Sequence, residues 1–240
     1  MRTEFLKLRT VRSPLLLLGA AQLVVLAGVS GLFVSGASLD DPATQLRAIG
    51  HAGLVSMFSL VLGIVGIAGE YRHRTVTDTY LGTPRRGRVV TAKLATYAVA
   101  GAVYGLVSSL VAVAATAIWL AAKGGSLDLS DGAVWRTLAG CVLWNACFAA
   151  IGVGLGALVR NLVAAIAVAL AWIALVEGIV GQLIGNLDRW LPFNSGLALE
   201  HLPTPGTDLL PQWGGGVVLA AYALLFAALA VSTTVRRDVS

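Results

Sequence analysis

The residue types that most often carry chemistry are few in this sequence, and they form no known reactive pattern. Cys141 and Cys147 lie inside one apolar segment, which favours small packing residues over a disulfide or a zinc site. His51, His73 and His201 fall in three separate segments without the spacing of metal ligands. No G-x-x-x-x-G-K-S/T phosphate loop occurs, so this chain does not cradle ATP by that motif. We therefore expect no catalytic residues and no metal or cofactor bound by this chain.

One carboxylate is exceptional because of its surroundings. Glu177 is the only acidic residue deep within an apolar segment, where a charge costs at least about 2.5 to 3.5 kcal/mol on insertion scales. Either it faces a cavity or a dimer interface, binding a cation or relaying a proton, or it is protonated or paired with a neighbouring helix. Asn145 and Gln22 are candidate partners of Glu177, or residues that form ordinary interhelical hydrogen bonds. These three residues are the candidates for a substrate path.

The polar stretch 69–93, GEYRHRTVTDTYLGTPRRGRVVTAK, holds the second set of candidate residues. Thr75 and Asp78 have the spacing of a capping box, which predicts a short helix from Val76 that ends before Gly82. The pair Thr83-Pro84 is typical of a helix start, so a second helix is expected to lead into the next apolar segment. Lipid phosphate is expected to hold the basic residues after this turn at the membrane surface. These anchors are Arg85, Arg86, Arg88 and Lys93.

This stretch is either a solvated loop that only sets the topology or a docking element. Two helix starts, an acidic residue at the membrane exit and a face bearing Thr and Tyr favour docking.

The elements around these residues are predicted to be membrane helices. The chain is 57% hydrophobic and 12% charged, whereas a soluble domain has roughly 25% charged residues. We expect an all-α membrane protein with a single domain over residues 1–240. Its six spans are predicted at residues 14–34, 48–68, 94–122, 134–159, 162–184 and 214–235.

The segments between the spans are predicted from residues that end helices or form turns. Residues 35–47 contain Asp40, Asp41 and Pro42, which favour a helix stop and a short aqueous loop. Arg160 and Asn161 form a tight hinge between the fourth and fifth spans, preceded by glycines at positions 152, 154 and 156 that favour close helix packing. Residues 185–213 are expected to form short interfacial helices and turns. Residues 1–13 form either an amphipathic helix on the membrane surface or a plain basic tail.

The basic residues predict the orientation in the membrane. With six spans both termini lie on one side, and that side receives 13 of the 17 lysines and arginines. The termini and residues 69–93 are therefore expected to be cytoplasmic, and residues 185–213 extracellular, in a multi-pass protein of the cell membrane. The same clustering at span ends explains the net charge of +5 without nucleic-acid binding.

The polar stretch resembles the cytoplasmic coupling segment of ABC-2 type transporter permeases. That segment has a Glu leaving the second span, then leucine, Thr-Pro, basic residues and a lysine entering the third span. The matching residues here are Glu70, Thr75, Leu81, Thr83, Pro84, Arg85, Arg86 and Lys93. Arg74 departs from the pattern, since many relatives have Gly there. The basic N-terminus, six spans and helical insertion before the last span also fit.

The resemblance implies a permease subunit of an ATP-driven exporter, with the fold of the type V exporters. It implies a second permease copy or homologue and two ATP-binding subunits, which would hold the ATP and Mg²⁺. The contact with the ATPase would be made by Glu70, Thr75, Val76, Asp78, Thr79, Tyr80 and Leu81. The substrate would be a drug, a peptide, a lipid-like molecule or an ion. The alternative is an ion-coupled secondary transporter that uses Glu177, although no convincing inverted repeat is visible.

Overall fold

A computed structural model describes residues 2–38, 41–72, 86–184, 186–202 and 208–236. Every regular element in these ranges is a helix, which confirms the predicted all-α class. Six helices of the described residues are long and apolar enough to cross a membrane. These candidate spans are Arg12–Val34, Pro42–Arg72, Gly87–Ala122, Gly132–Val159, Leu162–Val180 and Gln212–Thr233.

The spans follow the predicted order with small changes of boundary. Helix α2 covers Arg12–Val34, and the second span combines α3 (Pro42–Gly50), the 3₁₀ turn η1 (Gly53–Val55) and α4 (Ser56–Arg72). Helix α6 (Arg86–Ala122) forms the third span and α7 (Gly132–Val159) the fourth. The fifth runs through α8 (Leu162–Ala171), a π-helical turn η2 (Trp172–Glu177) and α9 (Gly178–Leu183), and the sixth is α11 (Gln212–Arg236).

The predicted loop over residues 35–47 is wrong from Pro42 onward, because α3 begins there. The Asp41 carboxylate accepts hydrogen bonds from the backbone N–H groups of Ala43 and Thr44, at 3.1 and 3.2 Å. The Thr44 hydroxyl adds a bond to Asp41 Oδ2 at 2.9 Å, and these bonds lower the pKa of Asp41, with the hydroxyl bond contributing most. Asp at the N-cap and Pro at the first helical position start a helix. The same residues that stop one helix therefore start the next.

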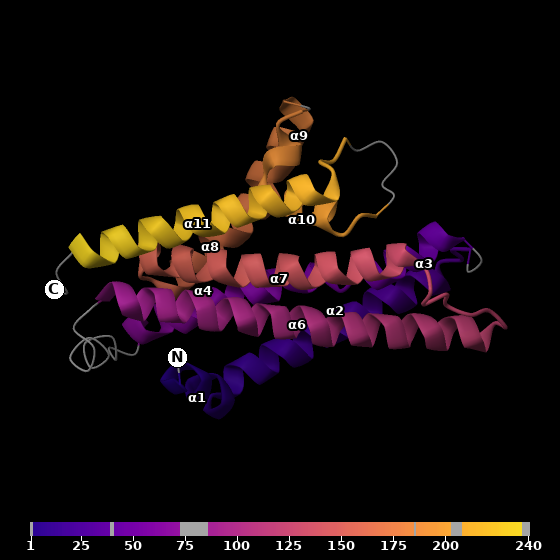
Figure 1. The fold of residues 1–240 in the computed structure, drawn as a ribbon, viewed down its shortest axis with the longest axis horizontal. Coiled ribbons are helices and arrows are strands. Elements are labelled where there is room, and N and C mark those ends of the chain that lie inside the picture. Colours follow the sequence, from indigo (N-terminus) through magenta and orange to yellow (C-terminus); the bar gives the residue numbers. More distant parts are fainter. Residues whose placement is uncertain (1, 39–40, 73–85, 185, 203–207, 237–240) are drawn as a thin grey trace.

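Close packing of α4 against α7 forms the centre of the bundle (Figure 1). A Cβ atom added to Gly152 would lie 2.1 Å from the carbonyl oxygen of Leu60. A Cβ atom added to Gly63 would lie 2.1 Å from the carbonyl oxygen of Ala149. Small residues on both helices thus bring the two backbones together, as at other membrane helix interfaces. This confirms the packing role predicted for the glycines of the fourth span.

The predicted hinge between the fourth and fifth spans is confirmed. Helix α7 ends at Val159, and Arg160 adopts the left-handed conformation with φ 55° while its N–H donates to the Gly156 carbonyl. Asn161 then caps α8, since its side-chain oxygen accepts from the Ala164 N–H at 3.0 Å. A left-handed residue followed by an Asn cap reverses the chain in two residues.

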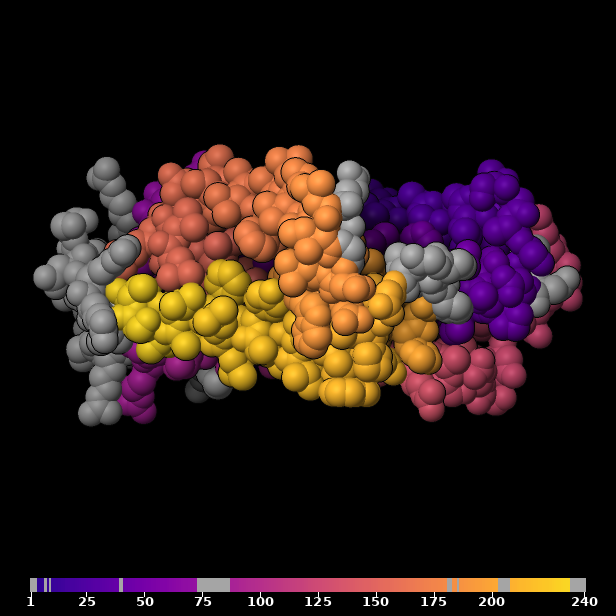
Figure 2. Space-filling view, turned by 90° about the horizontal axis from the view of Figure 1, so that it is seen from above, coloured from indigo at the N-terminus to yellow at the C-terminus, as the bar shows by residue number. Residues whose placement is uncertain are grey.

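Short helices occur between the fifth and sixth spans as predicted, namely η3 (Asp188–Trp190) and α10 (Pro192–Leu199). Helix α10 packs against α7 and α11, and its predicted position at the membrane interface stays a prediction. A Cβ atom on Gly140 of α7 would lie 1.9 Å from the Leu199 carbonyl oxygen. Figure 2 shows the orange residues of this region packed on the yellow surface of α11.

The N-terminal segment is helical over Arg2–Thr10, which forms α1. Of its apolar residues, Phe5 and Leu6 are exposed and Leu8 is half-buried. Glu4 points inward and is buried. The prediction that this helix lies on the membrane surface stays a prediction.

Substitution of Gly152 by Ala is expected to lower the free energy of unfolding by about 1 to 3 kcal/mol, because the new methyl group forces α4 and α7 apart. Gly19→Ala is the matched control, since nothing lies within 4 Å of a Cβ at that helical position. It should stabilise the protein by roughly 0.5 to 1 kcal/mol. Thermal unfolding in detergent measures both, and equal unfolding temperatures for the two variants would contradict the packing described above.

Candidate functional site

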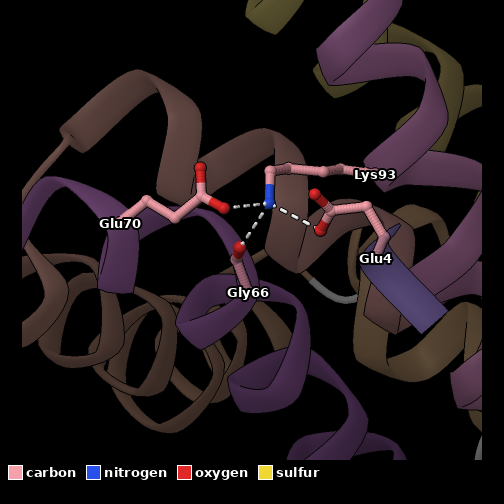
Figure 3. Close-up of polar contacts among 4 residues, drawn as sticks. All are labelled: Glu4, Gly66, Glu70 and Lys93. Atoms are coloured by element: carbon pink, nitrogen blue, oxygen red, sulfur yellow. Dashed lines mark hydrogen bonds and ion pairs between the residues drawn. The ribbon is translucent and has the colours of Figure 1, made fainter. Parts of the chain in front are cut away.

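The Lys93 side chain is buried at the point where the third span begins. Its ammonium donates hydrogen bonds to Glu4 Oε2 at 2.7 Å, to Glu70 Oε1 at 2.8 Å and to the Gly66 carbonyl oxygen at 3.1 Å (Figure 3). The lysine side chain is 1% exposed. An ammonium has three N–H donors, so all three are used. We call these four residues the Lys93 cluster.

The cluster joins three elements that are distant in the sequence. Glu4 comes from α1, Glu70 from the last turns of α4, and Lys93 from the first turns of α6. Glu70 and Lys93 also lie on either side of residues 73–85, the central part of the polar stretch. The two ends of this stretch are therefore held together by an ion pair whose side chains are 12% and 1% exposed.

The predicted role of Lys93 as an anchor on lipid phosphate needs correction, because its ammonium is engaged inside the protein. Arg88 is exposed, while Arg86 opens α6. The other residues predicted for anchoring or for ATPase contact lie outside the described residues. They are Thr75, Val76, Asp78, Thr79, Tyr80, Leu81 and Arg85. Their roles, and the predicted ATPase contact of Glu70, stay predictions.

Sequence reasoning missed Glu4 as a partner of Lys93. One signal was available, because Glu4 is the only acidic residue in a segment with four basic ones. A carboxylate has no part in the expected attraction of that segment to anionic lipid. Its burial at 6% exposure shows that it contacts protein instead.

Glu177 lies at the end of the π-helical turn η2, and it is 5% exposed. Its two carboxylate oxygens accept from the backbone N–H of Phe193, at 3.0 and 3.2 Å. Phe193 is the second residue of α10, so the carboxylate lies at a helix N-terminus, where N–H groups lack intrahelical partners and negative charge is favoured. Glu177 also lines a cavity of about 310 Å³.

Asn145 and Gln22 are not partners of Glu177. The Asn145 amide accepts from the Ser59 hydroxyl at 2.7 Å and donates to the Ala52 carbonyl at 3.3 Å, which fixes α7 against the junction of α3 and α4. Gln22 donates to the Ser108 hydroxyl at 2.9 Å and so joins α2 to α6. Both residues form the interhelical hydrogen bonds that were the alternative interpretation.

Glu200 is a second buried acid that sequence reasoning missed. It follows α10 directly and is 2% exposed, and the Cys141 thiol donates to its Oε1 at 3.8 Å. Burial raises the pKa of this carboxyl well above its usual value. The apolar run Leu197-Ala198-Leu199 directly before Glu200 was a signal of the burial that sequence reasoning did not use.

Comparison with known protein families shows to which family this chain belongs. Residues 15–192 match the family described as ABC-2 family transporter protein. The chain belongs to this family. The match covers more than half of the chain and includes Glu70, Lys93 and Glu177, whereas Glu4 precedes it. A comparison with curated proteins gives no match.

Membership of the ABC-2 family makes this chain a multi-pass membrane permease of an ABC transporter. It confirms the predicted family, which rested on the polar stretch and the six spans. Permeases of this family normally work with ATP-binding subunits and are not themselves the catalytic component. The family therefore supports an ABC permease over the ion-coupled secondary transporter.

Replacement of Lys93 by Met is expected to destabilise the permease by about 3 to 5 kcal/mol, because it leaves two glutamates buried without their common cation. The triple variant Lys93→Met, Glu4→Gln, Glu70→Gln removes every charge of the cluster and should recover most of this loss. Thermal unfolding in detergent measures both. If the Lys93→Met variant is as stable as the unmodified protein, the ammonium is not the essential member of the Lys93 cluster.

Glu200 should make stability depend on pH. A carboxyl whose folded pKa is raised binds its proton more tightly in the folded state. Its contribution is therefore complete below the unfolded value, 4.5, and is lost as the pH rises toward the folded value. Glu200→Gln removes this titration while keeping the shape. The unfolding temperature of the variant, minus that of the unmodified protein, should increase between about pH 5 and pH 8, and a constant difference would contradict this.

Proposed function

We propose that this chain is the membrane-spanning subunit of an ATP-driven exporter, working with two ATP-binding subunits and a second permease copy or homologue. The Lys93 cluster is the observation that carries the proposal beyond family membership. It joins the two ends of the polar stretch to each other and to the N-terminal helix. Because the polar stretch is held in this way, a displacement imposed on it by a partner is transmitted to the second and third spans together.

The coupling follows from the placement of the cluster. ATP and Mg²⁺ bind in the partner subunits, whose closure displaces the segment between Arg72 and Arg86. Since Glu70 belongs to the second span and Lys93 to the third, the 2.8 Å contact between them makes the two spans move together. Glu4 adds α1 to the same unit. Rigid-body movement of helices is one common way in which a small displacement at one site opens another.

The orientation and the direction of transport belong to this proposal. The excess of basic residues supports cytoplasmic termini and a cytoplasmic polar stretch. The ATP-binding subunits would then dock from the cytoplasm on residues 75–81 and Glu70, and the substrate would move outward. A drug, a peptide, a lipid-like molecule and an ion are the substrate classes consistent with the family.

Export coupled to ATP should require the polar stretch but not the loop at the other end of α6. Replacing residues 75–81 by a Gly/Ser linker of the same length should abolish both the capture of the ATP-binding subunit and substrate-stimulated ATP hydrolysis, because the docking side chains are lost. The same exchange over residues 124–130 is the matched control, and it should leave both unchanged.

The measurements are co-purification of the ATP-binding subunit from the native host and ATP hydrolysis by the reconstituted complex. Membrane insertion of each variant is checked by its yield in the membrane fraction. Unchanged capture and hydrolysis after the exchange at residues 75–81 would remove the coupling role. Failure of the unmodified permease to capture any ATP-binding subunit would contradict the proposed function as a whole.

A further inference from the structure

The cavity beside Glu177 lies inside the membrane bundle, between the second, fourth, fifth and sixth spans. Its lining residues all belong to candidate spans except Pro192, the first residue of α10. The cavity encloses about 310 Å³. An engineered apolar cavity of roughly 150 Å³ in another protein stays dry and binds benzene. This cavity therefore has room for a hydrocarbon ligand.

The cavity presents hydrocarbon, and almost no polar atoms, to a ligand. Among the residues that line it, Trp172, Glu177 and Tyr222 are the ones with polar side-chain atoms. The Glu177 carboxylate is already engaged, because it accepts from the Phe193 N–H at 3.0 and 3.2 Å and bonds the Asn194 N–H and the Trp172 side chain. A polar ligand would lose its hydrogen bonds without replacing them. The cavity therefore selects an apolar ligand.

The cavity is elongated in the direction of the spans. Phe148, Ile151 and Leu155 line it from α7, and their spacing of three and four residues places them on one face of that helix. The seven-residue step from Phe148 to Leu155 corresponds to roughly 10 Å along the helix axis. Helix α11 contributes Tyr222 and Phe226, which are one turn apart. A hydrocarbon chain that runs parallel to the spans, as the acyl chains of a bilayer do, follows this shape.

The cavity opens toward lipid between the fifth and sixth spans. Val168, Trp172 and Leu225 line it and are also 51%, 44% and 53% exposed on the outside of these spans. The floor, in contrast, is buried, since Leu60 and Phe148 are 3% and 2% exposed. Beyond η2 the fifth span leaves the direction of α11, and α9 rises steeply away from it (Figure 1). A ligand that reaches the floor by this route comes from the hydrocarbon of the bilayer.

The π-helical turn η2 forms the part of the wall beside the opening. It contributes Trp172, Ile173 and Glu177 to the lining. Single π-helical turns within α-helices occur frequently at functional sites. The Glu177 carboxylate bonds the Trp172 side chain and the start of α10, so it fixes the wall rather than contacting the ligand.

We propose that one acyl chain of a membrane phospholipid occupies this cavity and separates the fifth span from the sixth. Phospholipid chains are the most abundant hydrocarbon within a bilayer, so mass action favours them over other apolar ligands. A helix of a second permease copy is about 10 to 12 Å across with its side chains, so it could cover the opening but not enter. The bound chain reaches the buried floor, which lipids around the outer surface do not. This binding does not rest on the proposed function.

A phosphatidylcholine with a photoreactive diazirine in the middle of one acyl chain tests the proposal. The full-length permease is reconstituted with this lipid in nanodiscs and irradiated, and the cross-linked residues are identified by mass spectrometry. Cross-links are expected at the floor residues Leu60, Phe148 and Ile151, which are 3%, 2% and 6% exposed. Leu106 and Leu110 of α6 are exposed and report contact with lipid on the outer surface.

Filling the cavity should remove the cross-links at its floor. Ala169 lines the cavity and is 5% exposed, so Ala169→Phe should abolish labelling of the floor residues and leave that of Leu106 and Leu110 unchanged. Ala169→Leu, a smaller change, should reduce the floor labelling in part. Ala167→Phe is the matched control, since Ala167 is exposed on the same helix, and it should preserve the full pattern. Thermal unfolding checks that each variant is folded.

Three results would overturn the proposal. The first is unmodified permease that is labelled at Leu106 and Leu110 but not at the floor. The second is equal floor labelling in Ala169→Phe and the unmodified protein. The third is floor labelling by a free fatty acid with the same diazirine but not by the phosphatidylcholine, which would assign the cavity to another hydrocarbon. These measurements need no ATP-binding subunit, so their failure is distinct from failure of the coupling experiment.

Discussion

The buried ammonium of Lys93 is the interaction on which the relative arrangement of α1, α4 and α6 depends. Its partners lie 89 and 23 residues away in the sequence, in α1 and α4. Helices in a bilayer gain little from hydrophobic contact with one another, because lipid is as apolar as their side chains. A shared cation between two carboxylates therefore gives these three helices a specific relative position that apolar packing alone would not.

The spans could be predicted from sequence because span formation depends on the local length of apolar sequence. The Arg160-Asn161 hinge was also predictable, since a left-handed residue and a cap are local features. The segment around Pro42 was misinterpreted because Asp-Pro marks the end of one helix and the start of another equally well. Local composition does not distinguish the end of a helix from the start of the next one. The hydrogen bonds to the Asp41 side chain do distinguish them, because they show that a helix starts there.

The buried charges were less predictable, because each depends on a partner elsewhere in the chain. Lys93 has the residue type and the position expected of a surface anchor, at the start of a span. Only the approach of Glu4 makes it an internal residue. Asn145 and Gln22 were selected as polar residues within spans, but the sequence does not say which helix each one faces. Glu200 was overlooked because it lies outside the predicted spans, although α10 carries it into the bundle.

Helix α10 gives Glu177 and Glu200 different environments, because Glu177 lies at its N-terminus and Glu200 at its C-terminus. The N-terminal N–H groups favour a negative charge, whereas the C-terminal carbonyl groups disfavour one. Glu200 is moreover enclosed against Gly53 and Cys141. Glu177 instead adjoins a cavity with aromatic walls. One acid is thus suited to remain a neutral packing group, whereas the other caps the start of α10.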